Sequence, residues 1–118
     1  MEKIKCICVM RDLFQALAQL ENSLLSGYGL TLNEAMVLCS IAGETVTAGA
    51  IAERTGLMSS HASKVIRAAE RKGLLVRSLG EQDKRQMCFA LSEAGEDRLR
   101  HIREQGVDVP DLLRSFFE

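Results

Sequence analysis

Residues 57–74 read LMSSHASKVIRAAERKGL, and this pattern predicts one helix of about four turns with two different faces. Small apolar residues at helical spacing predict a core-facing stripe, made of Ala62, Val65, Ile66 and Ala69. The other face mixes short hydrogen-bonding groups with cations, namely His61, Ser63, Lys64, Arg67 and Arg71. Such a face suits a DNA groove, where cations meet phosphate and Ser, His or Arg reaches base edges. A solvated surface on an ordinary core helix has the same composition, so the flanking sequence has to decide.

The sequence before this helix predicts a second, shorter helix. It starts at Val46-Thr47, with Thr47 as the expected N-cap and Gly56 as the expected C-cap. Two helices separated by a tight glycine turn have roughly the spacing of a helix-turn-helix.

The sequence after Gly73 predicts a β-hairpin. Two apolar segments, 74–79 and 86–91, are the expected strands, and the polar segment 80–85 is the turn between them. A charged hairpin directly after a helix-turn-helix is the arrangement of a winged helix. The expected fold class is therefore mainly α with a small β-hairpin, the wing.

The two ends of the chain are also predicted to be helical. Residues 4–26 have an apolar face that is wider than one small core needs, and burial against a second subunit is one explanation. Ser92 is the expected cap of a helix from Glu93 to about Gln105. A short apolar tail, 111–117, ends in two phenylalanines that need burial.

Length and charge narrow the function. The 118 residues suffice for one domain, 1–118, with a modest core. The net charge is −1, but residues 58–85 carry seven cations against three anions, and residues 92–118 carry seven anions against four arginines. The basic middle segment favours a face that binds a polyanion. The acidic C-terminal segment favours a separate face with a different role.

Composition argues against several classes of protein. No apolar run approaches the roughly 20 residues that span a bilayer, and no signal sequence follows Met1. Four scattered cysteines do not make a disulfide framework, which favours a reduced, cytoplasmic protein. His61 and His101 have no nucleophile arrangement around them, and neither a phosphate-cradling loop nor a metal-ligand spacing is present. We therefore expect no enzyme activity, no cofactor and no metal.

Three pieces of the sequence stand out in order. They are LTLNEAMVL (30–38); residues 47–74, including IAERTGL (51–57) and ERKGL (70–74); and DKR (83–85) followed by LSEAG (91–95). Together they resemble the MarR family of bacterial winged-helix transcription regulators. The first piece is like the family's second helix, the second is like its helix-turn-helix, and the third is like its wing signature D-x-R and the join after it. The resemblance covers roughly residues 30–100. Three pieces in order at the right spacing are far more specific than any one of them.

The resemblance implies a homodimeric regulator, most simply a repressor, on a pseudo-palindromic DNA site. The implied parts are dimerisation helices 4–26 and 93–117 and a DNA-binding winged helix 30–91. Helix 58–73 would enter the major groove, and wing 80–86 would place Arg85 in the minor groove, where narrow A·T segments attract arginine. Asp83 would hold the wing and orient Arg85 through a charge-assisted hydrogen bond.

The predicted DNA contacts lie on the recognition helix and the wing. They are Ser59, Ser60, His61, Ser63, Lys64, Arg67, Arg77, Lys84 and Arg85. One departure affects the first turn: the family usually caps this helix with Ser or Thr, and here Met58 takes that position, with Ser59 as the alternative cap. Which of Ser59, Ser60 and His61 reaches bases therefore stays open. Arg77 has a second interpretation, a salt bridge to the wing carboxylate Asp83 or Glu81.

Other readings of the chain remain. Cys6 and Cys8 could sense oxidants, as an N-terminal thiol does in some family members, but packing inside the first helix is the favoured interpretation. Cys39 and Cys88 lie in apolar segments and are expected in the core. A small-molecule effector is a further partner that the family allows, although the C-terminal helices are short and its cavity is expected to be small or absent. The alternative function is a winged-helix protein-interaction module without a role on DNA.

Overall fold

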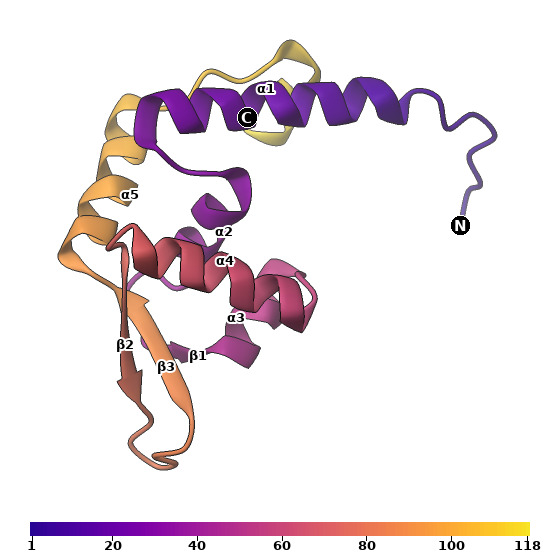
Figure 1. The fold of residues 1–118 in the computed structure, drawn as a ribbon. Helices are drawn as coiled ribbons and strands as arrows, with labels where there is room; N and C mark the ends of the chain where they lie inside the picture. Colours follow the sequence, from indigo (N-terminus) through magenta and orange to yellow (C-terminus); the bar gives the residue numbers. More distant parts are fainter. The chain divides into compact units, whose positions relative to one another are not determined.

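The computed structural model describes all residues, 1–118 (Figure 1). In chain order its elements are α1 (Met10–Tyr28), α2 (Leu32–Ser40), β1 (Val46–Thr47), α3 (Ala48–Thr55), α4 (Ser59–Arg71), β2 (Leu75–Leu79), β3 (Met87–Leu91), α5 (Glu93–Gln105) and the 3-10 helix η1 (Asp111–Phe116). The predicted fold class, mainly helical with a small antiparallel sheet, is confirmed. No helix combines the length and the apolar composition that crossing a bilayer requires.

The chain forms two compact units. The terminal unit contains residues 1–31 and 107–118, and the winged-helix unit contains residues 32–106. Within the terminal unit η1 contacts α1, and the buried apolar residues of these two helices are Ala16, Leu20, Leu24 and Leu113. The helix α5 belongs to the winged-helix unit.

The first helix begins later than its sequence predicts. The apolar pattern placed its start near Ile4, but α1 starts at Met10, and Val9 at the N-cap position makes no side-chain capping bond. The preceding residues include β-branched Ile and Val and two Cys, which favour helix weakly. Asp12 supplies the first negative charge of the first turn, where the helix dipole favours it.

The helix-turn-helix is formed by α3 and α4, and α2 packs against both. Thr47 caps α3 as predicted, because its Oγ1 accepts a hydrogen bond from the backbone N–H of Ala50 at 3.1 Å. Gly56 ends α3 with φ of +76°, a left-handed conformation that favours glycine. The predicted stripe of α4 is confirmed, and the side chains that it buries are Ala62, Val65, Ile66 and Ala69.

The sheet has one strand more than the predicted hairpin. β2 and β3 pair antiparallel, with Arg77 opposite Phe89, as the wing strands. Val46-Thr47, expected to begin a helix, instead forms β1 and pairs with β3, so the strand order is β1-β3-β2. Thr47 fits both positions because an N-cap residue has extended backbone, here φ −77° and ψ 161°. A two-residue strand has no periodicity that a sequence pattern can reveal.

Candidate nucleic-acid interface

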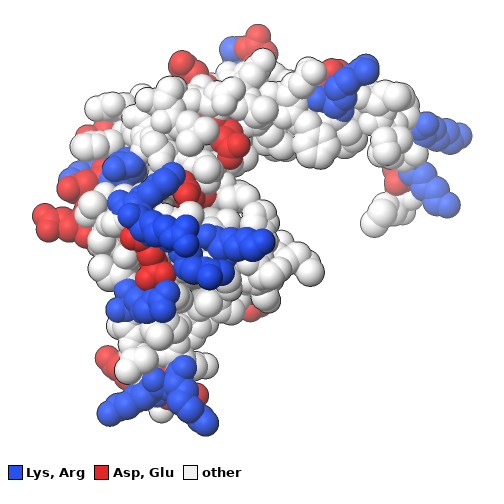
Figure 2. Space-filling view, in the orientation of Figure 1, with Lys and Arg blue, Asp and Glu red and all other residues white.

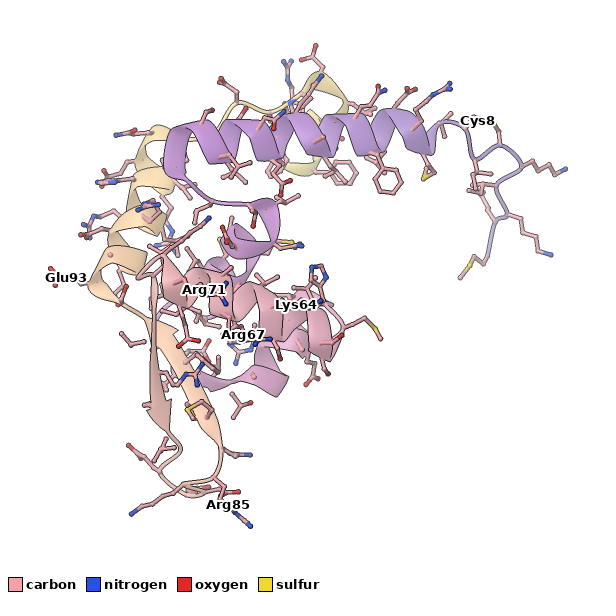
Figure 3. All side chains as sticks on the ribbon, viewed as in Figure 1. Cys8, Lys64, Arg67, Arg71, Arg85 and Glu93 are labelled. Atoms are coloured by element: carbon pink, nitrogen blue, oxygen red, sulfur yellow. The ribbon has the colours of Figure 1, made fainter.

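The exposed face of α4 carries the main cluster of cations in the winged-helix unit. Lys64, Arg67 and Arg71 are all exposed, and Lys and Arg side chains gather over α4 and at the tip of the wing (Figures 2 and 3). Arg71 follows Arg67 by four positions and Lys64 by seven, so the three cations share one helical face. That spacing is the signal by which the sequence could have placed Arg71 among the candidate contacts.

The first turn of α4 has no side-chain cap. Met58 occupies the N-cap position with extended backbone and supplies no capping oxygen, in keeping with the departure seen in the sequence. Ser59, Ser60 and His61 are exposed in this turn, and His61 Nε2 lies 3.5 Å from Asn33 Nδ2 of α2. Because no side chain covers the first turn, its backbone N–H groups and helix dipole favour an anion there.

The tip of the wing presents two cations. Asp83 Oδ1 accepts hydrogen bonds from the backbone N–H of Arg85 at 3.0 Å and from its Nε at 3.4 Å. Lys84 is exposed, and the Arg85 side chain is 94% exposed at the far end of the hairpin (Figure 3). The backbone of the turn is closed by Gln86, which donates its N–H to Asp83 O at 3.0 Å. The wing therefore holds the backbone of Arg85 while leaving its side chain in solvent.

Besides Arg85, two cations of the basic segment pair with carboxylates. Arg77 of β2 pairs with Glu70 of α4 in a bidentate contact, Nε to Oε2 at 3.1 Å and Nη2 to Oε1 at 2.7 Å. The expected alternative of a salt bridge to Asp83 or Glu81 was therefore wrong. The hydrogen bonds to the Glu70 carboxylate raise the pKa of Arg77 above its ordinary value. Lys72 Nζ donates to Glu34 Oε1 of α2 at 2.6 Å, and Glu34 is only 3% exposed. Sequence reasoning missed both ion pairs.

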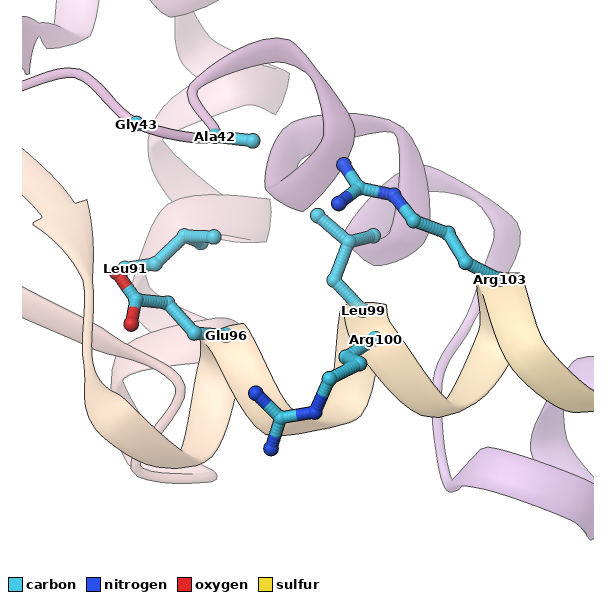
Figure 4. Close-up of a pocket in the computed structure, with 7 residues that line it drawn as sticks. All are labelled: Ala42, Gly43, Leu91, Glu96, Leu99, Arg100 and Arg103. Atoms are coloured by element: carbon cyan, nitrogen blue, oxygen red, sulfur yellow. The ribbon is translucent and has the colours of Figure 1, made fainter.

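A cleft of about 420 Å³ lies between α4 and the sheet. Its lining comes from Ala48, Ser63, Ile66, Arg67, Arg77, Met87 and Phe89. The predicted contacts Ser63 and Arg67 thus flank the same cleft as Arg77, while Lys84 and Arg85 lie at the wing tip. A second cleft of about 260 Å³ is lined by Leu91, Leu99 and Arg103 among others (Figure 4). That volume is below the roughly 300–1,000 Å³ typical of small-molecule sites.

The cysteines lie elsewhere than the sequence indicated. Cys6 and Cys8 precede α1 and are exposed, so packing inside the first helix does not describe them. Cys39 is exposed rather than part of the core, and Cys88 is half-buried. Partial desolvation nevertheless raises the pKa of the Cys39 thiol, an effect that the positive charge of Arg103 partly offsets.

The four thiols are expected to differ in reactivity towards a disulfide reagent such as DTNB. Near pH 7.5, Cys6 and Cys8 should react first because they are exposed, whereas the raised pKa of Cys39 lowers its thiolate fraction. Timed quenching with mass mapping of the labelled peptides measures the order. Raising the pH to about 9 should bring the labelling rate of Cys39 closer to the rates of Cys6 and Cys8. Labelling of Cys39 before Cys6 and Cys8 at pH 7.5 would contradict this assignment.

Comparisons with known proteins agree with this geometry. The model of the MarR family matches residues 28–86. The crystal structure of the transcriptional regulator BldR from Sulfolobus solfataricus has a TM-score of 0.73 at 18% identity, over 92% of this chain and 73% of that one. A probable transcriptional regulator from Pseudomonas aeruginosa gives 0.69 at 22% identity, over 85% and 83%.

A DNA-bound structure is also among the similar ones. The MepR–DNA complex of S. aureus has a TM-score of 0.65 at 20% identity, covering 81% of this chain and 80% of that one. No curated protein sequence matches the chain. At these identities the structures share the fold alone, whereas the family model covers half of the chain. The chain therefore belongs to the MarR family, whose members are transcription regulators and not enzymes.

Proposed function

We propose that this protein is a homodimeric, sequence-specific DNA-binding regulator that acts as a repressor in the cytoplasm. The observation that carries the proposal is the exposed cation stripe of α4, Lys64, Arg67 and Arg71, above an uncapped first turn. The only carboxylate of α4, that of Glu70, is occupied by Arg77. This face therefore offers phosphate several cations and no free anion, which is the charge pattern of a DNA surface.

On DNA, α4 enters the major groove by its first turn. Ser59, Ser60 and His61 then face base edges, and Lys64 and Arg67 meet the flanking phosphates. The wing reaches the neighbouring minor groove with Arg85, whose side chain is 94% exposed and contacts only Asp83. The fold shared with MepR, whose structure was determined with DNA, supports this arrangement.

Selection of bound duplexes from a random pool with the purified chain tests sequence-specific binding. A selected motif with two half-sites about one helical turn apart supports both the DNA function and the dimer. Retention of no duplex, even at low salt, would contradict the proposal and favour a protein-interaction module instead.

Lys64→Ala should weaken binding to all duplexes alike and lower the salt slope of log K by about 0.9, the share of one phosphate contact. Titrations of fluorescent operator between 50 and 200 mM salt measure the slope. His101→Ala is a matched control, because it truncates an exposed side chain of α5 outside α4 and the wing. A slope equal to that of the unsubstituted protein would remove Lys64 from the interface.

The dimer contact is proposed to lie in the terminal unit. Large apolar side chains are exposed there, including Phe14 at 72%, Phe116 at 76% and Phe117 at 65%. Burying these side chains against a second copy of the chain lowers the free energy of the dimer. A dimer also supplies the two-fold symmetry that reading a pseudo-palindromic site requires.

Phe14→Ser should shift the protein towards monomer. Losing the burial of one phenylalanine costs about 2 kcal/mol per protomer, so the dimer dissociation constant should rise on the order of a thousandfold. Sedimentation equilibrium measures this change. Val76→Ser is the control, since Val76 is 51% exposed but lies in the wing strand β2. Equal dimer dissociation constants for Phe14→Ser and Val76→Ser would place the dimer contact away from Phe14.

Repression has its own test. A reporter whose promoter overlaps the selected site should be silenced when the chain is expressed and released by Lys64→Ala. Activation of that reporter would retain the DNA function while overturning the repressor assignment.

A further inference from the structure

We infer that Glu70, Arg77 and Phe89 form a clamp that sets the angle between the recognition helix and the wing, so that both fit adjacent grooves of one duplex. The inference rests on the proposed DNA function. It assigns Glu70 and Arg77 as positioning residues and removes Arg77 from the set of direct phosphate contacts.

The clamp joins the recognition helix to the first strand of the wing. Glu70 lies on α4, and Arg77 lies on β2. Two hydrogen bonds, at 2.7 and 3.1 Å, use both carboxylate oxygens and two guanidinium nitrogens, which fixes the orientation of the two planes as well as their distance. A single hydrogen bond would leave the guanidinium of Arg77 free to rotate relative to the Glu70 carboxylate.

The third member of the clamp is the ring of Phe89, which contacts the guanidinium. Arg77 Cζ lies 5.5 Å from the centroid of the Phe89 ring, within cation–π range. Phe89 is 4% exposed on the central strand β3, where it faces Arg77 of β2 on one side and Val46 of β1 on the other. The clamp therefore links α4 to all three strands of the sheet.

Burial and charge favour a positioning role over a phosphate contact. The Arg77 and Glu70 side chains are 47% and 21% exposed, so solvent screens this pair less than it screens the Arg85–Asp83 pair at the wing tip, where the exposures are 94% and 44%. Arg77 and Glu70 together carry no net charge, so the pair attracts phosphate less than an unpaired arginine does. The carboxylate in turn would repel DNA if Arg77 left it.

The two roles predict opposite signs for Glu70→Gln. If Arg77 contacted phosphate, this substitution would release the guanidinium, remove an anion and tighten DNA binding. If the clamp positions the wing, the same substitution should weaken DNA binding about threefold, because a partly exposed ion pair contributes only a small free energy. The comparison uses the full chain and the selected operator in fluorescence titrations.

Arg77→Gln and the double variant complete the cycle. The clamp predicts that Arg77→Gln weakens binding at least as much as Glu70→Gln, because it leaves the Glu70 carboxylate unpaired. It also predicts that the salt slope stays unchanged and that the double variant loses no more than Arg77→Gln alone. A slope lower by about 0.9 for Arg77→Gln would assign it to phosphate and overturn the inference. Glu81→Gln is the matched control: it removes an exposed wing carboxylate outside the clamp and should tighten binding slightly.

One readout is independent of DNA. The Nε–H signal of Arg77 in ¹⁵N NMR spectra should be protected from solvent exchange in the unsubstituted protein and exposed in Glu70→Gln, while the rest of the spectrum keeps its dispersion. An unprotected Arg77 signal in the unsubstituted protein overturns the clamp even where DNA binding is intact. An unsubstituted protein that binds no duplex overturns the proposed function instead, whatever the Arg77 signal reports.

Discussion

Replacing Arg85 with alanine should lower the affinity for the selected operator on the order of thirtyfold, because one side chain that reads a groove is worth about 2 kcal/mol. Asp83 already holds the backbone and Nε of Arg85, so much of the ordering that binding needs is present in the free protein. An arginine in a narrow minor groove gains from its negative potential and from losing little hydration. Fluorescence anisotropy at one fixed salt concentration measures the loss.

Lys84→Ala separates groove reading from simple charge. Lys84 is exposed at the same wing tip, so both variants remove one cation from the same region. We expect Lys84→Ala to cost less and to act equally on all sequences. Arg85→Ala should in addition reduce the preference for A·T over G·C pairs beneath the wing. Equal losses in both variants, with the preference unchanged, would mean that the wing contributes charge without reading the groove.

The sequence predicts the winged helix well because its main signals are local. Helical spacing identified the buried face of α4, and Gly56 and Thr47 marked the ends of α3. The two wing strands followed from apolar runs on either side of a polar turn. Strand β1 could not be predicted, since it exists only through its pairing with β3, some forty residues later in the chain.

The candidate site was predictable in its cations but not in its ion pairs. Lys64 and Arg67 stand out because no carboxylate precedes Glu70 on the helix. The partner of Arg77 could not be read in the same way. Glu70 and Arg77 are seven positions apart across a chain reversal at Gly73, and only the path of the chain after that glycine brings them together. The start of α1 was missed because apolar periodicity continues beyond the helix, whereas helix propensity does not.

The glycine that follows the wing leads to the largest expected effect on stability. A Cβ at Gly95 would lie 2.2 Å from the backbone oxygen of Leu74 and 3.1 Å from its carbonyl carbon. Leu74 O also accepts the N–H of Ser92 at 3.0 Å, and Ser92 Oγ bonds both Gly95 N and Gly73 O. The start of α5 is thus fixed by backbone atoms against Gly73 and Leu74, the two residues just before β2.

Gly95→Ala should therefore lower the free energy of unfolding by about 3 kcal/mol, at the upper end of ordinary overpacking. Urea unfolding followed by circular dichroism measures the change in midpoint. Gly49→Ala is the matched control: Gly49 also lies in the first turn of a helix, but its Cβ would meet only Thr47 Oγ1, at 3.9 Å. That variant should gain about 0.5 kcal/mol from helix propensity. The chemical change is identical at both positions, so opposite signs would identify the contact between Gly95 and the Leu74 backbone as the cause. A Gly95→Ala protein as stable as the unsubstituted chain would refute this explanation.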